Sequence, residues 1–279
     1  MAIFAKETVT FLAALQTTTI MLIDTHAHLD QSEFDEDRQE VIDRARDAGV
    51  ERILAVAIDA DSAAASVQLA AKHEMIFAAV GMQPNYCAQA KEGDWERILA
   101  LVDSPKVIAI GETGLDYFRS DGDLDWQRER FRTHIRAAKR CGKPLIIHTR
   151  AAKADTIQIM QEEGAESPGG VMHCFTEDWP MARQALEMGF YISFSGIITF
   201  KNAADLREVV KQVPMEQLLI ETDSPYLAPV PHRGKPNQPL YVNAVAECVA
   251  QLKGLSKEAV AAQTKDNFYR CFPLAQTRG

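Results

Sequence analysis

The feature that most constrains the fold is an eightfold alternation of short apolar runs with amphipathic segments. Each run is short enough for one buried strand, and the segments between runs place apolar residues at helical spacing, as in residues 41–48 before Gly49. Chains that alternate strand and helix build parallel sheet, because neighbouring parallel strands need a long crossover between them. The eight apolar runs are 21–28, 52–58, 76–82, 106–112, 144–149, 170–175, 190–195 and 218–223.

Eight strand–helix units predict an α/β protein of the (β/α)8 TIM-barrel class. The chain of 279 residues is long enough for this fold, and no repeat, low-complexity tract or Pro/Gly/Ser-rich linker divides it. We therefore expect a single barrel domain over residues 21–279. Residues 1–20 have one lysine balanced by Glu7 and no clear cleavage site, which disfavours a signal peptide. We expect an N-terminal extension there, either a disordered tail or the product of a start upstream of a natural Met21.

Composition narrows the function further. With 47% hydrophobic and 25% charged residues the chain is globular, and its net charge of -9 disfavours binding nucleic acid through a broad basic surface. Local phosphate contacts at a metal site are compatible with that charge. The five cysteines are dispersed and form no Cys-x-x-Cys pair, which predicts neither a disulfide framework nor a thiolate zinc site and fits a reducing cytoplasm. No stretch reaches the roughly 20 apolar residues of a membrane span.

Ionisable side chains gather where the predicted strands end. In a (β/α)8 barrel, functional groups come from the C-terminal ends of several strands. His26 and His28 lie two apart on one strand, so both side chains can face the barrel axis. One histidine at such an end is more often a hydrogen-bonded structural residue, but four of the seven histidines lie at three of these ends. The full set of candidate metal ligands is His26, His28, Glu112, His148, His173 and Asp223.

The acids near these strand ends have alternative roles. Glu112 and Asp223 each follow an apolar run, where a buried carboxylate needs a cation or hydrogen bonds. A helix N-cap or a buried ion pair is the alternative for both, although the proline-rich loop after Asp223 disfavours an immediate helix. Asp24 and Glu221 are expected to support the ligands at most. Asp116 is equally compatible with a turn.

The donor types indicate the ions. Imidazole and carboxylate ligands without thiolate suit zinc, manganese, iron or magnesium. Six candidate ligands exceed what one tetrahedral ion takes, whereas two divalent ions bridged by a carboxylate would use all six. Two-ion sites generate hydroxide near neutral pH and are common in phosphoesterases. The ligand set therefore predicts a hydrolase.

Six segments, in order along the chain, resemble the TatD-type metal-dependent hydrolases, which are deoxyribonucleases with a (β/α)8 fold in the amidohydrolase superfamily. The resemblance runs from Met21 to about Phe272 and is specific, because its motifs cover nearly the whole barrel. The segments are DTHAHLD (24–30), AIGETGLDY (109–117), PLIIHTR (144–150), GVMHCFTE (170–177), YISFSGIITF (191–200) and LLIETDSPYLAPVPHRGKPNQP (218–239).

The resemblance implies two divalent ions, Mg, Mn or Zn, and DNA as the substrate. Phosphodiester bonds would be cut in the 3′ to 5′ direction, with single-stranded ends as the expected form of DNA. Asp223 would take the proton of the attacking water, which makes Asp223 and Glu112 the predicted catalytic residues. One ion would be held by His26, His28, Glu112 and Asp223, and the other by Glu112, His148 and His173.

The predicted substrate contacts depart from the family pattern at one position. Many relatives read Gly-Val-His-Pro after the third strand, with a histidine expected to contact the substrate phosphate, whereas this chain has Gln83 there. Arg150, Arg233 and Lys235 follow strands on the predicted catalytic face and are the other candidate phosphate contacts, with Arg233 and Lys235 favoured. Each alone would be an ordinary surface charge. Further residues with this placement are Lys153 and Lys201, and those that could stack an unpaired base or serve core packing are Tyr86, Tyr117, Phe118 and Tyr226.

Two other functions remain open. An amidohydrolase acting on a small cyclic amide or ester would use the same barrel. Many two-metal members of that class bridge their ions with a carboxylated lysine, and none of these strand ends offers a lysine. A barrel that keeps its metal for stability and serves as a binding partner is the third function, which the complete ligand set disfavours. We expect a cytoplasmic monomer that acts on DNA and does not bind membranes.

Overall fold

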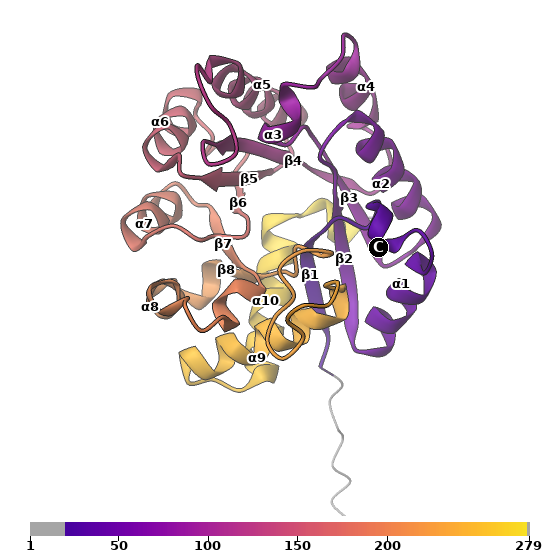
Figure 1. Cartoon of the computed structure of the whole chain (residues 1–279), viewed down its shortest axis with the longest axis vertical. Coiled ribbons are helices and arrows are strands. Elements are labelled where there is room, and N and C mark those ends of the chain that lie inside the picture. Colours follow the sequence, from indigo (N-terminus) through magenta and orange to yellow (C-terminus); the bar gives the residue numbers. More distant parts are fainter. Residues whose placement is uncertain (1–19, 278–279) are drawn as a thin grey trace, which may run out of the picture.

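The computed structural model describes residues 20–277, and eight parallel strands form its centre (Figure 1). The strands are hydrogen-bonded in chain order, each to the next, so the predicted (β/α)8 TIM barrel is confirmed. The predicted extension over residues 1–20 falls, except for residue 20, outside the described residues. The strands are β1 (Leu22–Ala27), β2 (Val50–Val56), β3 (Ile76–Val80), β4 (Val107–Asp116), β5 (Leu145–Arg150), β6 (Gly170–Met172), β7 (Tyr191–Phe194) and β8 (Leu218–Ile220).

The first and last strands meet just beyond their C-terminal ends. Ala27 forms a parallel bridge with Ser224, the Asp223 N–H donates to the His26 carbonyl over 2.9 Å, and the His28 N–H donates to the Ser224 carbonyl over 2.8 Å. These bonds close the ring of strands. They also hold His26 of β1 and His28, just after β1, directly beside Asp223, although the histidines are almost 200 positions from Asp223 in the sequence.

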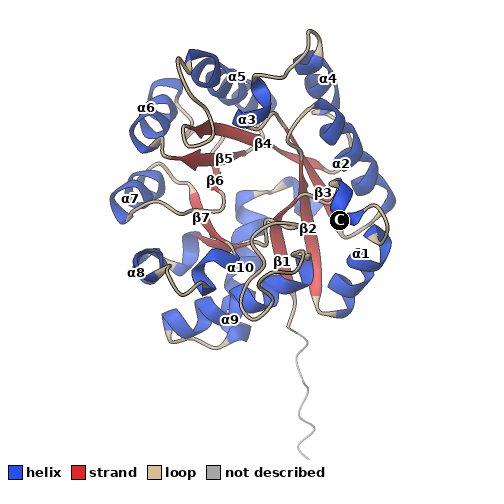
Figure 2. Ribbon diagram, viewed as in Figure 1, coloured by secondary structure: helices blue, strands red, loops and turns tan. Residues whose placement is uncertain are grey.

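Helices follow the strands and cover the outside of the barrel (Figure 2). Local sequence sets their limits: the Asp59 carboxylate accepts the Ser62 N–H at the start of α2, and Gly142 with φ +64° ends α5. Among the described residues, no helix combines the length and apolarity needed to cross a membrane. The helices are α1 (Arg38–Asp47), α2 (Ala60–Lys72), α3 (Pro84–Cys87), α4 (Asp94–Leu101), α5 (Asp125–Cys141), α6 (Lys153–Glu163), α7 (Trp179–Glu187), α8 (Ala204–Gln212), α9 (Val242–Lys253), α10 (Lys257–Cys271) and α11 (Leu274–Thr277), with 3-10 turns η1 (Ser32–Phe34), η2 (Gly196–Thr199), η3 (Met215–Gln217) and η4 (Pro239–Tyr241).

The interior of the barrel is a separate hydrophobic layer. Ile23 of β1 and Phe77 of β3 belong to one buried cluster with Phe268 of α10. The Asn267 side chain of the same helix donates over 2.8 Å to the carbonyl of Leu218, the first residue of β8. Helix α10 therefore covers the N-terminal ends of the strands, and the C-terminal ends are left for the site.

Strand β4 differs most from its predicted range. It continues to Asp116, so Glu112 lies inside the strand and is neither at its end nor at a helix N-cap. The pairing with β5 shifts register around Glu112. Gly114, with φ +128°, permits the close approach of the two strands, because a Cβ there would lie 1.9 Å from the His148 carbonyl oxygen. The extended strand carries two acids, Glu112 and Asp116, to the same end of the barrel.

Candidate metal centre

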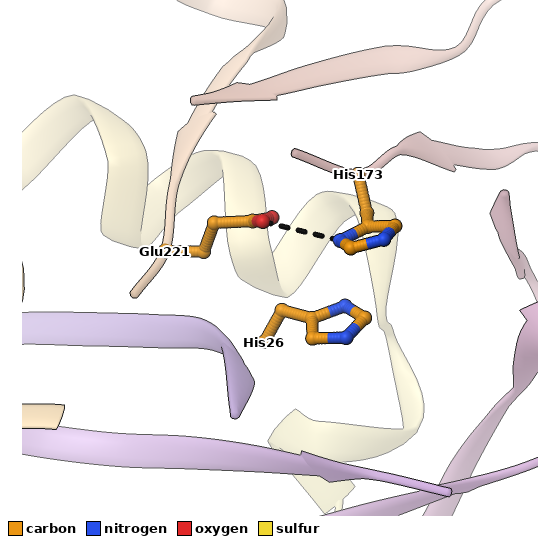
Figure 3. A group of neighbouring side chains, drawn as sticks. All are labelled: His26, His173 and Glu221. Carbon is orange, nitrogen blue, oxygen red and sulfur yellow. Dashed lines mark hydrogen bonds and ion pairs between the residues drawn. The ribbon is translucent and has the colours of Figure 1, made fainter. Parts of the chain in front are cut away.

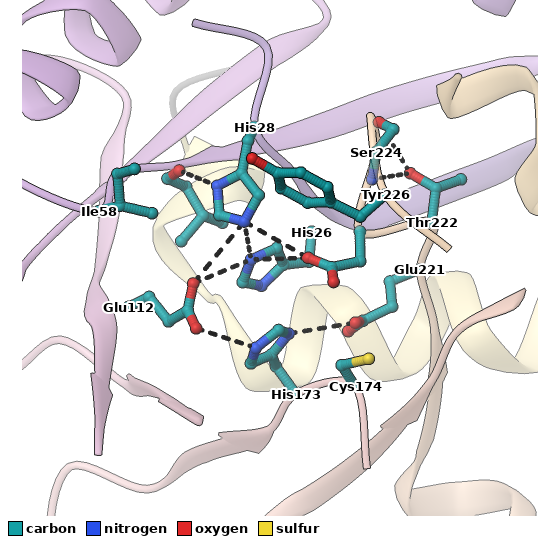
Figure 4. Close-up of polar contacts among 12 residues, drawn as sticks. His26, His28, Ile58, Glu112, His173, Cys174, Glu221, Thr222, Ser224 and Tyr226 are labelled. Atoms are coloured by element: carbon teal, nitrogen blue, oxygen red, sulfur yellow. Dashed lines mark hydrogen bonds and ion pairs between the residues drawn. The ribbon is translucent and has the colours of Figure 1, made fainter. Parts of the chain in front are cut away.

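The six candidate ligands converge at the C-terminal ends of the strands, at the base of a cavity of about 600 Å³. His26 is fully buried below the cavity, and Glu112, His28 and His173 are almost fully buried. The six ligands lie in or within three residues after β1, β4, β5, β6 and β8, which are far apart in the sequence. Figure 4 shows His26, His28, Glu112 and His173 meeting at the centre of the cluster. The barrel therefore assembles one cluster from five strands.

Glu112 lies between two groups of imidazoles. Its Oε1 is 3.1 Å from Nδ1 of His148 and 3.2 Å from Nε2 of His173. Its Oε2 is 3.6 Å from Nε2 of His26 and 3.7 Å from Nε2 of His28 (Figure 4). The two oxygens of one carboxylate thus face separate pairs of nitrogen donors.

Asp223 completes the group on the Oε2 side of Glu112. Its Oδ1 is 3.3 Å from Nε2 of His28 and 3.7 Å from Nε2 of His26. The residue has φ +57°, a conformation that non-glycine residues adopt rarely and that is commonly found at functional sites. The hydrogen bond from its own N–H to the His26 carbonyl holds this backbone in place.

Hydrogen bonds behind the imidazoles determine which ring nitrogen faces the cluster. Nδ1 of His28 donates to the Val56 carbonyl over 2.8 Å, because a carbonyl can only accept, and its Nε2 is left to face Glu112 and Asp223. Nδ1 of His173 donates to the Glu221 carboxylate over 3.1 Å (Figure 3). Such partners fix the ring orientation and raise the basicity of the ligand.

Asp116 plays the same part for His148. Its Oδ2 accepts from Nε2 of His148 over 3.1 Å, which turns Nδ1 toward Glu112. Its Oδ1 accepts the N–H groups of Phe118 and Arg119, each over 3.0 Å. Asp116 therefore orients a candidate ligand and also begins the loop after β4. The sequence suggested only the second role, that of a turn residue.

Asp24 supports the seam between β1 and the segment after β8. Its two oxygens accept from the N–H of Thr222 over 2.8 Å and from the Thr222 hydroxyl over 2.5 Å. Burial raises the pKa of Asp24 to about 8 despite these bonds. Asp24 also accepts the His26 N–H. Its hydrogen bonds to Thr222 hold the neighbouring Asp223 in position.

The acids of the cluster attract positive charge. Burial alone would raise the pKa of Glu112, but the imidazoles of His173 and His148 lower it well below its usual value. Burial would lower the pKa of His28, but the Asp223 carboxylate raises it to about 9. The pKa of His26 is lowered by burial and by the charge of His173. The cluster thus keeps its carboxylates ionised and draws a cation toward them.

The donors fit a divalent cation. Three of their buried atoms have no hydrogen-bond partner among the described residues, which is costly for polar atoms in a protein interior unless an ion binds them. They are His26 Nδ1, Glu221 Oε2 and Asp223 Oδ1. Three groups each bring their ligand atoms within 4.8 Å of one another: His26, His28 and Asp223; Glu112, His148 and His173; and His26, His173 and Glu221.

The predicted substrate contacts divide into two sets. Gln83 and Arg150 line the cavity, whereas Arg233 and Lys235 are not among its lining residues. The Arg233 guanidinium instead lies 3.8 Å from the ring centre of Phe200 and donates to a carbonyl of its own loop. The long β8–α9 loop folds back on the loop after β7, and this packing occupies Arg233.

The other basic and aromatic candidates divide in a similar way. Tyr86 and Tyr226 line the cavity. The Tyr117 hydroxyl is bonded to Asp155, and Lys153 is paired with Asp178 at 2.7 Å. Phe118 lies under the Arg150 guanidinium at the rim, and Lys201 is exposed and not among the cavity residues.

Arg119 lines the cavity and was missed from the sequence. The predicted fourth strand ends at residue 112, whereas β4 ends at Asp116. Arg119 therefore does not follow the predicted strand end closely enough to be a candidate. The "GLDY" stretch after Glu112, an apolar residue followed by an acid and an aromatic, was the signal that the strand continues.

A family model described as "TatD related DNase" matches residues 23–273. The chain belongs to the TatD family. YabD of Bacillus subtilis, named an uncharacterized metal-dependent hydrolase, is 46% identical over 254 residues, which cover 91% of this chain and 100% of the relative. A protein of Erwinia tasmaniensis named 3′-5′ ssDNA/RNA exonuclease TatD is 31% identical, with 91% of this chain and 100% of the relative covered.

A solved structure agrees with this assignment. The TatD homologue YjjV of Escherichia coli superposes with a TM-score of 0.87 at 28% identity, covering 91% of this chain and 99% of the other. The resemblance seen in the sequence is thus confirmed, and the protein is a TatD-family metal-dependent hydrolase with a cluster able to hold metal.

Proposed function

We propose that this TatD-family hydrolase cleaves phosphodiester bonds of DNA at single-stranded ends, in the 3′ to 5′ direction, with two divalent ions of Mg, Mn or Zn. The observation that carries the proposal is the position of Glu112, whose two oxygens face separate groups of imidazoles. One carboxylate between two such groups is the arrangement expected of a pair of bridged cations. The name of the Erwinia tasmaniensis relative supports a nucleic-acid substrate.

The proposed ligands fall into two sets that share Glu112. When bound, two divalent cations lower the pKa of a water molecule and polarise the phosphoryl group. The protein holds three of the histidine ligands in fixed orientation, through hydrogen bonds to Val56, Asp116 and Glu221. The first set is His26, His28 and Asp223 together with Glu112, whose Oε2 faces both histidines, and the second is Glu112, His148 and His173.

Asp223 is the proposed acceptor of the proton from the attacking water. Its side chain lines the cavity and is 13% exposed, so a water in the cavity can approach the carboxylate. The buried Oδ1 has no hydrogen-bond partner among the described residues. The imidazoles of His28 and His26 keep the pKa of Asp223 below its usual value against the effect of burial. Asp223 is therefore ionised at neutral pH, and its carboxylate can accept a hydrogen bond from the attacking water.

Gln83 is proposed to bind the substrate as a neutral donor. Its Oε1 accepts the Asn85 N–H over 2.7 Å, so the side-chain NH2 group is the part left to face the cavity. An NH2 group donates to a phosphoryl oxygen as an imidazole N–H does, but without a positive charge. We expect substrate binding to depend less on pH at this position than it would with a histidine.

The test is hydrolysis of end-labelled single-stranded DNA by protein freed of metal with a chelator and then supplied with Mg²⁺, Mn²⁺ or Zn²⁺. We expect activity only after metal is restored, and its loss in a His148→Ala, His173→Ala double variant. His232→Ala is the matched control, because His232 stacks on Tyr241 outside the cavity lining.

The same assay covers the competing substrates. RNA and small cyclic amides or esters are tested in parallel, and labels at either end report the direction of cutting. Full DNA hydrolysis by the double variant would contradict the proposed ligand sets. Hydrolysis of a cyclic amide without any DNA cleavage would replace the phosphodiesterase with an amidohydrolase.

A further inference from the structure

The wall of the cavity is uneven in charge. Arg119 lines it from the loop after β4, and Arg150 lines it from the last position of β5. The opposite wall, next to β8 and β1, is lined by Gln31, Tyr226 and Leu227, and no lysine or arginine of the described chain lines it. In a ring of eight strands in chain order, β4 and β5 stand across from β8 and β1. Among the described residues, the arginines of the cavity lining are thus confined to one side.

The two cavity arginines are free of acidic partners. Within the described chain, no carboxylate lies within ion-pair distance of either guanidinium. Over the full sequence, acids outnumber lysines and arginines by 39 to 30. Eight other arginines are paired with an acid: Arg38, Arg44, Arg46, Arg97, Arg128, Arg132, Arg136 and Arg183. Unpaired arginines at the mouth of a cavity are available to phosphate groups.

An aromatic platform accompanies these cations. The Arg150 guanidinium lies 4.0 Å from the ring centre of Phe118, and Phe118 is 67% exposed. Asp116 anchors the N–H groups of both Phe118 and Arg119, and the same carboxylate holds His148. The platform and the candidate metal centre are therefore positioned by one side chain. An exposed ring beside a planar guanidinium is a surface on which a nucleobase stacks.

The uncharged wall has a different character. Tyr226 is 43% exposed and Leu227 beside it is half-buried, so this wall offers aromatic and apolar surface. Arg233 is the arginine or lysine nearest in sequence to Tyr226 and Leu227. Its guanidinium packs on Phe200 and is hydrogen-bonded within its own loop. A group bound here meets no lysine or arginine from the cavity lining.

We infer that a nucleic-acid strand leaves the cleavage site over the β4–β5 rim. Arg119 and Arg150 bind the phosphates next to the scissile one, and a base stacks on Phe118. The terminal nucleoside, which carries no further phosphate, occupies the wall formed by Tyr226 and Leu227. The assignment rests on the proposed function, and it differs from the sequence-based expectation that favoured Arg233 and Lys235 as phosphate contacts.

The test compares two substrates that differ in the groups beyond the scissile bond. A single-stranded oligonucleotide has neighbouring phosphates and bases, whereas bis(p-nitrophenyl) phosphate has no neighbouring phosphate. Arg119→Ala and Arg150→Ala should each reduce the slope of log kcat/KM for the oligonucleotide against log salt concentration by about 0.7. The small diester should show no change in that slope. Arg183→Ala, which removes an exposed arginine of α7, is the matched control.

Phe118 is tested separately. Phe118→Ala should raise KM for the oligonucleotide by about 5- to 150-fold and leave KM for the small diester unchanged, whereas Phe118→Trp should keep oligonucleotide binding. Anisotropy of a labelled oligonucleotide, titrated in chelator, gives a binding readout that needs no metal. Melting temperatures of all variants check that the fold is intact.

If the nucleic-acid strand instead leaves over the β8–α9 loop, the opposite result is expected. A lower salt slope in Arg233→Ala and Lys235→Ala, with Arg119→Ala and Arg150→Ala unchanged, would overturn the assignment. Hydrolysis of the small diester with unchanged oligonucleotide kinetics in all rim variants would also overturn it, while sparing the phosphodiesterase. Failure to hydrolyse any phosphodiester would overturn both.

Discussion

Acidification should destabilise this protein through His134, a buried histidine of α5 outside the candidate metal centre. Its Nε2 accepts the Met82 N–H over 2.9 Å, and its Nδ1 donates to the Arg130 carbonyl over 2.8 Å. The ring is fully buried and packs on Trp95 with 4.5 Å between ring centres. A neutral imidazole satisfies both bonds, whereas a protonated one cannot accept from Met82.

The size of the effect follows from the pKa. Burial lowers the pKa of His134 from 6.5 to about 3. Between these values the unfolded chain binds a proton that the folded chain excludes, so stability is complete above pH 6.5 and is lost as pH falls toward 3. At about 1.36 kcal/mol per pH unit, the loss at pH 4.5 is about 3 kcal/mol, and the full loss is about 5 kcal/mol.

Denaturant unfolding at pH 7.0 and pH 4.5, in chelator, measures this loss in the wild type and in His134→Gln. The variant lacks the titrating ring but keeps an acceptor for the Met82 N–H. Because all other groups titrate alike in both proteins, the difference between their pH effects isolates His134. We expect the wild type to lose about 3 kcal/mol more than the variant between the two pH values. An equal loss in both would refute the argument.

Two further predictions concern the support of the centre. Glu221→Gln and Asp116→Asn should each weaken divalent-ion affinity by about 10- to 100-fold in calorimetric titration, because each acid orients one imidazole. Unchanged affinity in both variants would contradict that role. Asp155→Asn is the control. Gly114→Ala should destabilise the protein by about 1–3 kcal/mol or more in thermal unfolding, because its Cβ would meet a β5 carbonyl at 1.9 Å. Gly122 also has a positive φ, but a Cβ there would meet no atom. An equal loss of stability in Gly122→Ala would therefore assign the effect at Gly114 to backbone strain alone.

Much of the candidate centre could be predicted because parallel strands bring their C-terminal ends to one face. His26, His28, His148 and His173 were found by their position after apolar runs, without knowledge of any contact. The least accurate boundary was the end of β4. The register shift around Glu112 extends that strand to Asp116, and such a shift depends on the pairing with β5, which a local pattern does not contain.

The rim of the cavity was less predictable, because loop side chains are placed by partners from other loops. Arg233 and Arg150 look alike in the sequence, since each follows a strand on the same face. Arg233 is drawn onto Phe200 of a neighbouring loop, while Arg150 rests on Phe118 at the cavity mouth. Either stacking partner is distant in the chain from its arginine.

The sequence by itself determined the number and order of the strands and the residue types at their ends, since burial periodicity and strand direction are local properties. Tertiary structure alone decided that Glu112 lies between two imidazole groups, and that Asp116 and Glu221 orient them. It also decided which arginines reach the cavity. The physical reason is that distances of a few ångströms between separate strands depend on register, packing and loop conformation, which are properties of the whole fold.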